Sequence, residues 1–208
     1  MPRLFAAIEI PHHAAMMLSM LKGGLSGARW IDQENYHLTL RFMGDLENHV
    51  ADEVLNELAA VKKPKFEIGL SGLNAFGGKK PHSLYAQTTA CPSLYELQSE
   101  IARKCQRIGL PPDPKKFTPH VTIARLRKST PEAVANYLSQ RGGFYVAPFT
   151  IERFVVMSSR DSVGGGPYVI EQAYDLGGLS MPPPNRVPND SAPARIIRQT
   201  SSNPSSPP

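Results

Sequence analysis

The sequence predicts an α+β fold with two similar lobes, and two observations support this. The hydrophobic pattern follows the order strand, helix, strand, helix, two strands, helix, strand, helix and two strands, which differs from the regular alternation of a parallel sheet. In addition, one short pattern occurs twice. Residues 36–42 read Tyr-His-Leu-Thr-Leu-Arg-Phe, and residues 119–125 read Pro-His-Val-Thr-Ile-Ala-Arg. Because the His-x-Thr unit recurs in both halves of the chain, we expect two related lobes.

Strands are predicted where apolar residues alternate with polar ones or form a short continuous run. In chain order they lie at residues 3–10, 29–31, 36–42, 66–70, 83–88, 119–125, 149–157 and 167–176; the short edge strand at residues 29–31 is additional to the seven main strands. Pro11 ends the first of these strands, and Gly44-Asp45 ends the third. Residues 74–81 carry glycines and lysines and are predicted to form the long tip of a hairpin, and residues 160–166 a glycine-rich turn.

Four helices are predicted between these strands; they begin at His12, Asn48, Pro92 and Thr130. The helix from Pro92 has the clearest amphipathic pattern, which extends to Ile108. Asn48 is expected to cap its helix, and Thr130 is expected to cap another that has Pro131 at its first position. The helices end near Gly23, Pro64, Gly109 and Gly142, which are residue types that interrupt helices.

Two parts of the chain differ in composition. Residues 1–180 are predicted to form one folded domain of two lobes. Residues 181–208 hold eight of the twenty prolines and almost nothing apolar, so they cannot bury enough surface to offset their ordering entropy. We expect residues 181–208 to be a disordered tail.

Charge and cysteine content indicate the kind of partner and the redox environment of the protein. The formal net charge is +5 and the sequence pI is about 9.3, which suits a polyanionic partner. Cys91 and Cys105 would lie roughly 21 Å apart on a helix, too far for a disulfide, which needs α-carbons within about 7 Å. No signal peptide and no long apolar run are recognisable, so we expect a cytoplasmic protein without a membrane span.

The repeated motif suggests acid–base chemistry on an anion. In a strand, side chains two residues apart share one face, so His37 lies beside Thr39 and His120 beside Thr122. Imidazole can accept or donate a proton near neutral pH, and hydroxyl groups can donate to phosphate oxygens. Arg125 can add a charge-assisted contact. Clustered carboxylates that would hold Mg²⁺ are missing, so neither a metal nor a cofactor is expected. One His-x-Thr pair is more often an ordinary polar pair, and from the residues alone both interpretations stay open.

The motifs and their flanks resemble the 2H phosphoesterase superfamily, in particular its bacterial RNA 2′,3′-cyclic phosphodiesterase (2′-5′ RNA ligase) branch. The resemblance covers roughly residues 3–178 and rests on four stretches: residues 3–8, residues 30–44, residues 117–125, and Ser159-Arg160 with Gly166-Pro167-Tyr168. It implies two antiparallel sheets with flanking helices around a central cleft. It also implies hydrolysis of 2′,3′-cyclic phosphate ends of RNA, tRNA fragments among them, to 2′-phosphates, with slow reversible 2′-5′ ligation. Nothing in the sequence demands more than a monomer, which is the expected state.

By that resemblance, His37 would protonate the departing O3′ and His120 would activate water. Thr39, Thr122 and Arg125 would hold the phosphate. Two alternatives remain: the same chemistry on 2′-5′ oligonucleotides or small cyclic nucleotides, and an RNA-end binding module without turnover.

Several other residues are secondary candidates. Phe76 is predicted either to stack on the terminal base or to be an ordinary loop aromatic packed on the sheet. Arg41 is predicted to alternate toward the cleft and touch phosphate. Four lysines are candidates for an RNA backbone path: Lys79, Lys80, Lys115 and Lys116. The remaining histidines lack partners at useful spacing and are taken as surface residues: His12, His13, His49 and His82.

Overall fold

The computed structural model describes residues 3–159 and 166–177, which form nine strands, four α-helices and a short 3₁₀ turn, η1 (Gln33–Asn35). The strands are β1 (Arg3–Glu9), β2 (Ala28–Trp30), β3 (His37–Asp45), β4 (Phe66–Phe76), β5 (Ser83–Thr88), β6 (His120–Leu126), β7 (Tyr145–Ile151), β8 (Arg153–Ser159) and β9 (Tyr168–Asp175). The helices are α1 (His12–Ser19), α2 (Asn48–Leu58), α3 (Pro92–Arg107) and α4 (Pro131–Gln140). The predicted turn at residues 160–166 and the predicted tail fall, apart from Gly166, outside the described residues.

The strands form one antiparallel sheet in the order β7-β4-β5-β6-β3-β1-β8-β9, and β2 pairs with the free part of β6. The α+β class is therefore confirmed. The two expected sheets are the two halves of this single sheet, which is a correction. The halves meet where β3 pairs with β6 through a single residue pair, Leu38 and Val121. This narrow junction lies directly beside His37 and His120, so the two motifs are neighbours in space.

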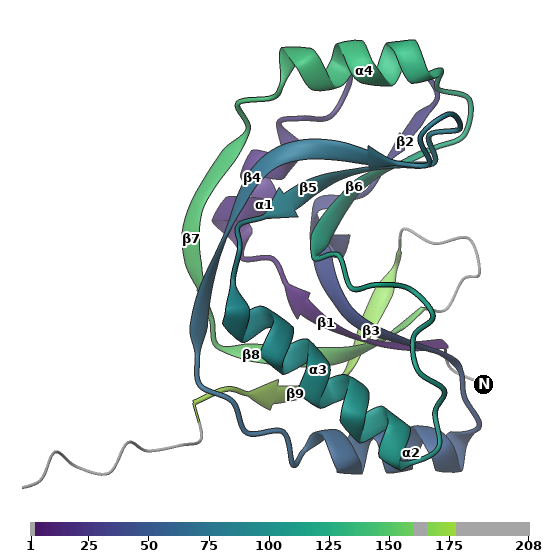
Figure 1. Ribbon diagram of the computed structural model, residues 1–208, viewed down its shortest axis with the longest axis vertical. Helices are drawn as coiled ribbons and strands as arrows, with labels where there is room; N and C mark the ends of the chain where they lie inside the picture. The colour runs from purple at the N-terminus through teal and green to yellow at the C-terminus, as the bar shows by residue number, and fades with distance from the viewer. Residues whose placement is uncertain (1–2, 160–165, 178–208) are drawn as a thin grey trace, which may run out of the picture.

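Helices lie at both ends of the molecule, with α4 at one end and α2 at the other (Figure 1). The apolar side of α3 is fully buried, with Leu94, Leu97 and Ile101 at 0% exposure, and their burial is the main term holding this helix to the sheet. α3 also packs along α2. On the other half, the Tyr137 hydroxyl of α4 donates to the carbonyl of Leu21, just after α1.

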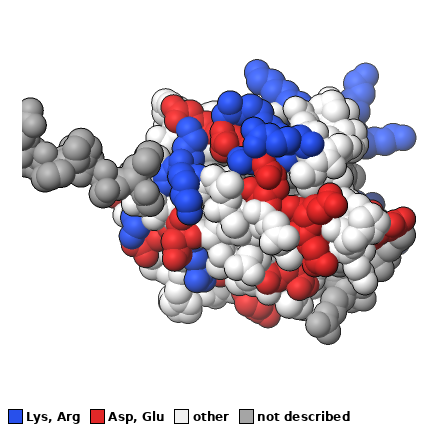
Figure 2. Space-filling model, turned by 90° about the horizontal axis from the view of Figure 1, so that it is seen from below, with Lys and Arg blue, Asp and Glu red and all other residues white. Residues whose placement is uncertain are grey.

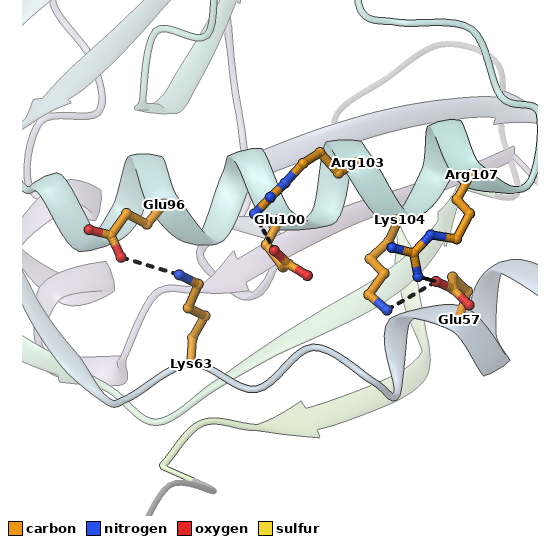
Figure 3. Close-up of polar contacts among 7 residues, drawn as sticks. All are labelled: Glu57, Lys63, Glu96, Glu100, Arg103, Lys104 and Arg107. Atoms are coloured by element: carbon orange, nitrogen blue, oxygen red, sulfur yellow. Dashed lines mark hydrogen bonds and ion pairs between the residues drawn. The ribbon is translucent and has the colours of Figure 1, made fainter.

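Ion pairs connect α3 to α2 and to the chain that follows α2 (Figure 3). Lys104 and Arg107 each place a nitrogen 3.0 Å from one carboxylate oxygen of Glu57, and Lys63 lies 3.2 Å from Glu96. Lys104 is only 8% exposed, so its ammonium requires this partner. Figure 2 views the molecule from the α2 side and shows acidic and basic side chains interspersed. The net positive charge therefore does not make this side a uniformly basic surface.

Several predicted boundaries need correction. The expected strand at residues 149–157 is two strands, because the chain leaves the β4 edge after Ile151, starts β8 at Arg153 and pairs with β1 from Val155 onward. β4 extends to Phe76, through residues predicted as loop. Asn48 is the first residue of α2, and the capping position is Glu47, without a side-chain cap. The Thr130 cap is confirmed, since its hydroxyl accepts from the Ala133 amide at 3.2 Å.

Two further expectations concern cysteines and membrane spans. Cys91 and Cys105 are both buried free thiols, as predicted. Within residues 3–159 and 166–177, no helix is long and apolar enough to cross a membrane.

Candidate active site

The two motif strands share a β-bulge at the same motif position. β1 pairs along β3 but passes over Leu40, and β5 pairs along β6 but passes over Ile123. Each bulged residue comes three positions after the motif histidine. An inserted residue of this kind reverses the alternation of side chains beyond it. The twin motifs are thus similar in backbone geometry as well as in sequence.

The bulges decide which side chains face the histidines. Beyond them, Arg41 and Ala124 turn to the buried face, at 4% and 0% exposure. Phe42 and Arg125 turn to the exposed face instead. Arg125 therefore joins His120 and Thr122, although regular alternation from Thr122 would have pointed it away.

A cavity of about 160 Å³ lies where the two motif strands meet. Most of the residues proposed from the motifs line it. The full lining is Ile31, Asn35, His37, Thr39, Phe76, His82, Ser83, His120, Thr122, Arg125 and Tyr168. The structure thus brings both histidines, both threonines and Arg125 to one small polar space.

Each catalytic candidate is oriented by a backbone carbonyl two residues before it. His37 Nδ1 lies 2.9 Å from the carbonyl oxygen of Asn35, and His120 Nδ1 lies 2.6 Å from that of Thr118. A carbonyl only accepts, so in the neutral rings Nδ1 carries the proton. Nε2 is then the basic nitrogen left to the cavity in both rings.

Aromatic side chains enclose both imidazoles. The His37 ring centroid lies 5.0 Å from that of Phe5 and 4.9 Å from that of Tyr168, and the His120 ring lies 4.9 Å from Phe76 and 5.0 Å from Tyr85. Burial lowers the pKa of His37 to about 4, against the opposing effect of its hydrogen bond to Asn35. Burial also lowers the pKa of His120. The positive charge of Arg125 lowers both further.

The site therefore holds two neutral imidazoles and one guanidinium at neutral pH. A bound phosphate anion would offset the charge of Arg125 and favour a proton on one ring. The hydroxyls of Thr39 and Thr122 lie on the same strand faces as the two rings, where they can donate to phosphate oxygens. One protonated and one neutral imidazole form an acid–base pair.

Arg41 does not line this cavity, and the expectation that it faces the cleft is wrong. The bulge at Leu40 turns its side chain to the buried face, where its guanidinium donates to the carbonyl of Pro111 and lies 3.6 Å from Asp113. It thereby fixes the chain that leads from α3 toward Thr118. Arg41 supports the loop that orients His120, so its effect on the site is indirect.

We expect Arg41→Ala to reduce the free energy of unfolding by about 2 kcal/mol, because it removes packed methylenes and leaves the Pro111 carbonyl unpaired. Urea denaturation measures this. The matched control is Arg127→Ala at an exposed position, which should change stability by less than about 0.5 kcal/mol. Equal effects of the two substitutions would contradict the structural role of Arg41.

Five cavity residues are not among the predicted site residues, and two of them, Asn35 and Tyr168, bear on the position of His37; the others are Ile31, His82 and Ser83. Asn35 accepts a hydrogen bond from the Tyr168 amide at 3.3 Å through its side chain, while its own carbonyl orients His37. Gly166, at φ +97°, packs so closely that an added Cβ would lie 2.3 Å from the Asn35 side chain. The start of β9 is therefore held against His37, and only the Gly-Pro-Tyr stretch hinted at this in the sequence.

The remaining candidates differ in whether they line the catalytic cavity. Phe76 stacks on Tyr85, with centroids 4.2 Å apart, and also lines the cavity, so stacking on a base stays a prediction. His82, taken as a surface residue, is exposed but lines the cavity beside buried Ser83.

Lys115 and Lys116 line an adjoining cavity, whereas Lys79 and Lys80 are exposed and line neither of these two cavities. In the described part of the chain, no three His, Cys, Asp or Glu side chains are grouped to hold a metal ion.

Comparison with known proteins shows relatives of one kind. A protein from Geobacillus stearothermophilus named RNA 2′,3′-cyclic phosphodiesterase is 30% identical over 128 residues, which are 58% of this chain and 41% of that protein. Proteins of the same name from Aquifex aeolicus and Thermotoga maritima are 28% and 27% identical. These matches cover 72% and 85% of this chain, and 82% and 97% of the relatives. The chain thus spans less than half of the Geobacillus protein and most of the other two.

Solved structures show the same fold. The protein TT0787 of Thermus thermophilus superposes with a TM-score of 0.72 at 20% identity, over 86% of this chain and all of that one. E. coli LigT in complex with 3′-AMP superposes with a TM-score of 0.69 at 18% identity, over 85% of this chain and 99% of that one. The sequence profile described as the 2′-5′ RNA ligase superfamily matches residues 22–162, a span that includes both motifs. The chain therefore belongs to the 2′-5′ RNA ligase superfamily.

Proposed function

We propose that this protein is an RNA 2′,3′-cyclic phosphodiesterase, which hydrolyses the cyclic phosphate at an RNA end to a 2′-phosphate. The observation that carries the proposal is the pair of imidazoles, each oriented by a backbone carbonyl and both lining one cavity with Arg125. The name of the relatives supports this substrate class. Suitable substrates are RNA fragments with cyclic phosphate ends, those of tRNA among them.

In the proposed reaction, Nε2 of neutral His120 takes a proton from water as its oxygen attacks phosphorus. The bond from phosphorus to O3′ breaks, and Nε2–H of His37, protonated once the phosphate anion is bound, gives its proton to O3′. The acid role of His37 follows the resemblance, since the pKa values of the free rings favour a proton on His120. Arg125 and the hydroxyls of Thr39 and Thr122 stabilise the charge that builds on the non-bridging oxygens. The two imidazoles supply both proton transfers, so the reaction as proposed needs no metal or cofactor.

Ligation follows the same path with a different nucleophile. If a 5′-hydroxyl replaces water, the attack on phosphorus joins the two ends by a 2′-5′ linkage and again expels O3′. Water greatly exceeds 5′-hydroxyl ends in concentration, so ligation should be the slower, reversible side of the activity.

A short RNA ending in a 2′,3′-cyclic phosphate, incubated with the protein in excess EDTA, tests the proposal. We expect multiple turnovers in the parent protein. 2′-5′-linked oligonucleotides and small cyclic nucleotides serve as competing substrates. If the protein turns over only these competing substrates, the proposed substrate class is wrong. Tight binding of the RNA end without turnover would instead identify a binding module. A monomeric state and a cytoplasmic location stay predictions.

A further inference from the structure

A second cavity, of about 390 Å³, opens beside the catalytic one. The two share Thr39, Phe76, His82 and His120 in their walls. The rest of its lining comes from β3, from the loop after β4, from α3, and from the chain before β6: Leu40, Phe42, Gly77, Gln98, Asp113, Lys115, Lys116, Phe117 and Thr118. Its volume is in the range of small-ligand pockets. Any substrate longer than the reacting ribose phosphate must leave the small cavity, and this space adjoins it directly.

Aromatic rings line the second cavity. Phe42 is 51% exposed, which is unusual for a phenylalanine in a strand, and it faces this space because of the bulge at Leu40. It occupies the motif position that Arg125 has in the other strand. Phe117 lies in the chain before β6. It is half-buried and packs edge-on against Tyr95, with the two ring centroids 5.5 Å apart. Exposed and fixed aromatic rings are surfaces on which nucleobases stack.

The charge of the second cavity suits a phosphodiester. Lys115 and Lys116 are exposed at its edge, and neither forms an ion pair with another of the described residues. The one acidic lining residue, Asp113, is already engaged. It accepts from the Lys115 amide at 3.1 Å and lies 3.6 Å from Arg41. The local charge is therefore positive.

The other neighbouring cavity has the opposite character. It has a volume of about 480 Å³, shares Asn35 and Tyr168 with the catalytic cavity, and contains Glu9 and Glu34 but no lysine or arginine. Glu9 is paired with Arg153 at 2.8 Å, so the uncompensated charge in the lining on that side is that of Glu34, and no basic residue lines that cavity to attract a polyanion. Lys115 and Lys116 attract it on the other side. The arrangement selects one direction for the RNA chain.

We propose that the second cavity binds the nucleotide that precedes the cyclic-phosphate nucleotide, with its base against Phe42 and Phe117 and its phosphodiester beside Lys115 and Lys116. The inference rests on the proposed function and restricts its substrates to oligonucleotide ends. The protein is selective for oligonucleotide ends over cyclic mononucleotides, which have nothing to place in this cavity.

Binding of the reaction products tests the inference independently of turnover. Calorimetry compares a dinucleotide ending in a 2′-phosphate with the matching nucleoside 2′-phosphate. We expect the parent protein to bind the dinucleotide at least about tenfold more tightly. Phe42→Ala, and the double substitution Lys115→Ala with Lys116→Ala, should each bring this ratio close to one. The lysine variant should also weaken the salt dependence of dinucleotide binding.

The matched control is Lys62→Ala, which removes one exposed lysine from the chain between α2 and β4 and should keep the parent ratio. A parent ratio near one, or a ratio that neither cavity variant changes, would overturn the inference. The two proposals fail separately. Dinucleotide preference without turnover of the cyclic phosphate would contradict the proposed function alone, whereas turnover without this preference would contradict only the second cavity's role.

Discussion

Replacing either motif histidine with alanine should lower kcat on a cyclic phosphate RNA end by about 10²–10⁴-fold, the usual contribution of a general acid or base. His37→Ala and His120→Ala remove the only two imidazoles that the motifs bring to the cavity. Each ring accepts no more than one proton, so one cannot serve both steps at once. Initial rates at saturating substrate measure the effect. His49→Ala is the control, since that ring is exposed and its partner is Glu47.

A substrate with sulfur at the 3′ bridging position separates the two roles. A thiolate leaves without protonation far more readily than an alkoxide, because thiols have a pKa of about 8.5. His37→Ala should therefore lose most of its defect on the sulfur substrate, whereas His120→Ala should stay as slow as on the natural one. The reverse pattern would exchange the acid and the base, and equal defects on both substrates would argue against a specific role for His37 as acid.

Arg125→Gln should lower kcat/KM by about 10²–10³-fold, because it removes a charged donor aimed at the developing phosphate charge. It should also move the pH profile. Burial and Arg125 hold the pKa values of both histidines below 6.5, and that of His37 at about 4. The free protein needs one protonated and one neutral ring, so kcat/KM should peak below pH 6.5 and fall as pH rises above it. Removing the cation raises both pKa values, so the whole profile should move to higher pH.

Arg127→Gln is the control for this experiment. Arg127 directly follows β6, is exposed, and does not line the catalytic cavity. Its substitution should leave both the rate and the position of the profile unchanged. A profile that stays in place in Arg125→Gln would show that this guanidinium does not act on the two rings as its position indicates.

The core of the site could be predicted from the sequence because it depends on local periodicity. His37 with Thr39 and His120 with Thr122 follow from side-chain alternation within single strands, and the repeat indicated that the two strands act together. Arg41 and Arg125 are two residues for which side-chain alternation predicts the wrong face. The strand pattern contains no sign of the bulges, and each bulge reverses the faces of the residues that directly follow it, Arg41 and Phe42 in β3 and Ala124 and Arg125 in β6. Regular alternation therefore predicts the wrong face for Arg41.

The remaining features could not be predicted because they depend on pairing between residues that are far apart in the sequence. Residues 145–159 form a nearly continuous β-like run, and only the partners β4 and β1 reveal that it belongs to both halves of the sheet. Likewise Asn35 and Tyr168 are 133 residues apart, and their contact across the sheet brings them both to His37. The sequence predicts the elements, but apart from the Gly-Pro-Tyr stretch at the start of β9 it contains no sign of these contacts.

The most direct test of the central claim is the identity of the product. The protein, in excess EDTA, is given an RNA end with a 2′,3′-cyclic phosphate, and the product is identified by phosphorus NMR. We predict a 2′-phosphate, formed by the parent protein and lost in both His37→Ala and His120→Ala. A 3′-phosphate would contradict the assignment of O3′ as the leaving group, and a 2′-phosphate that still forms at the parent rate without either histidine would contradict the twin-histidine mechanism.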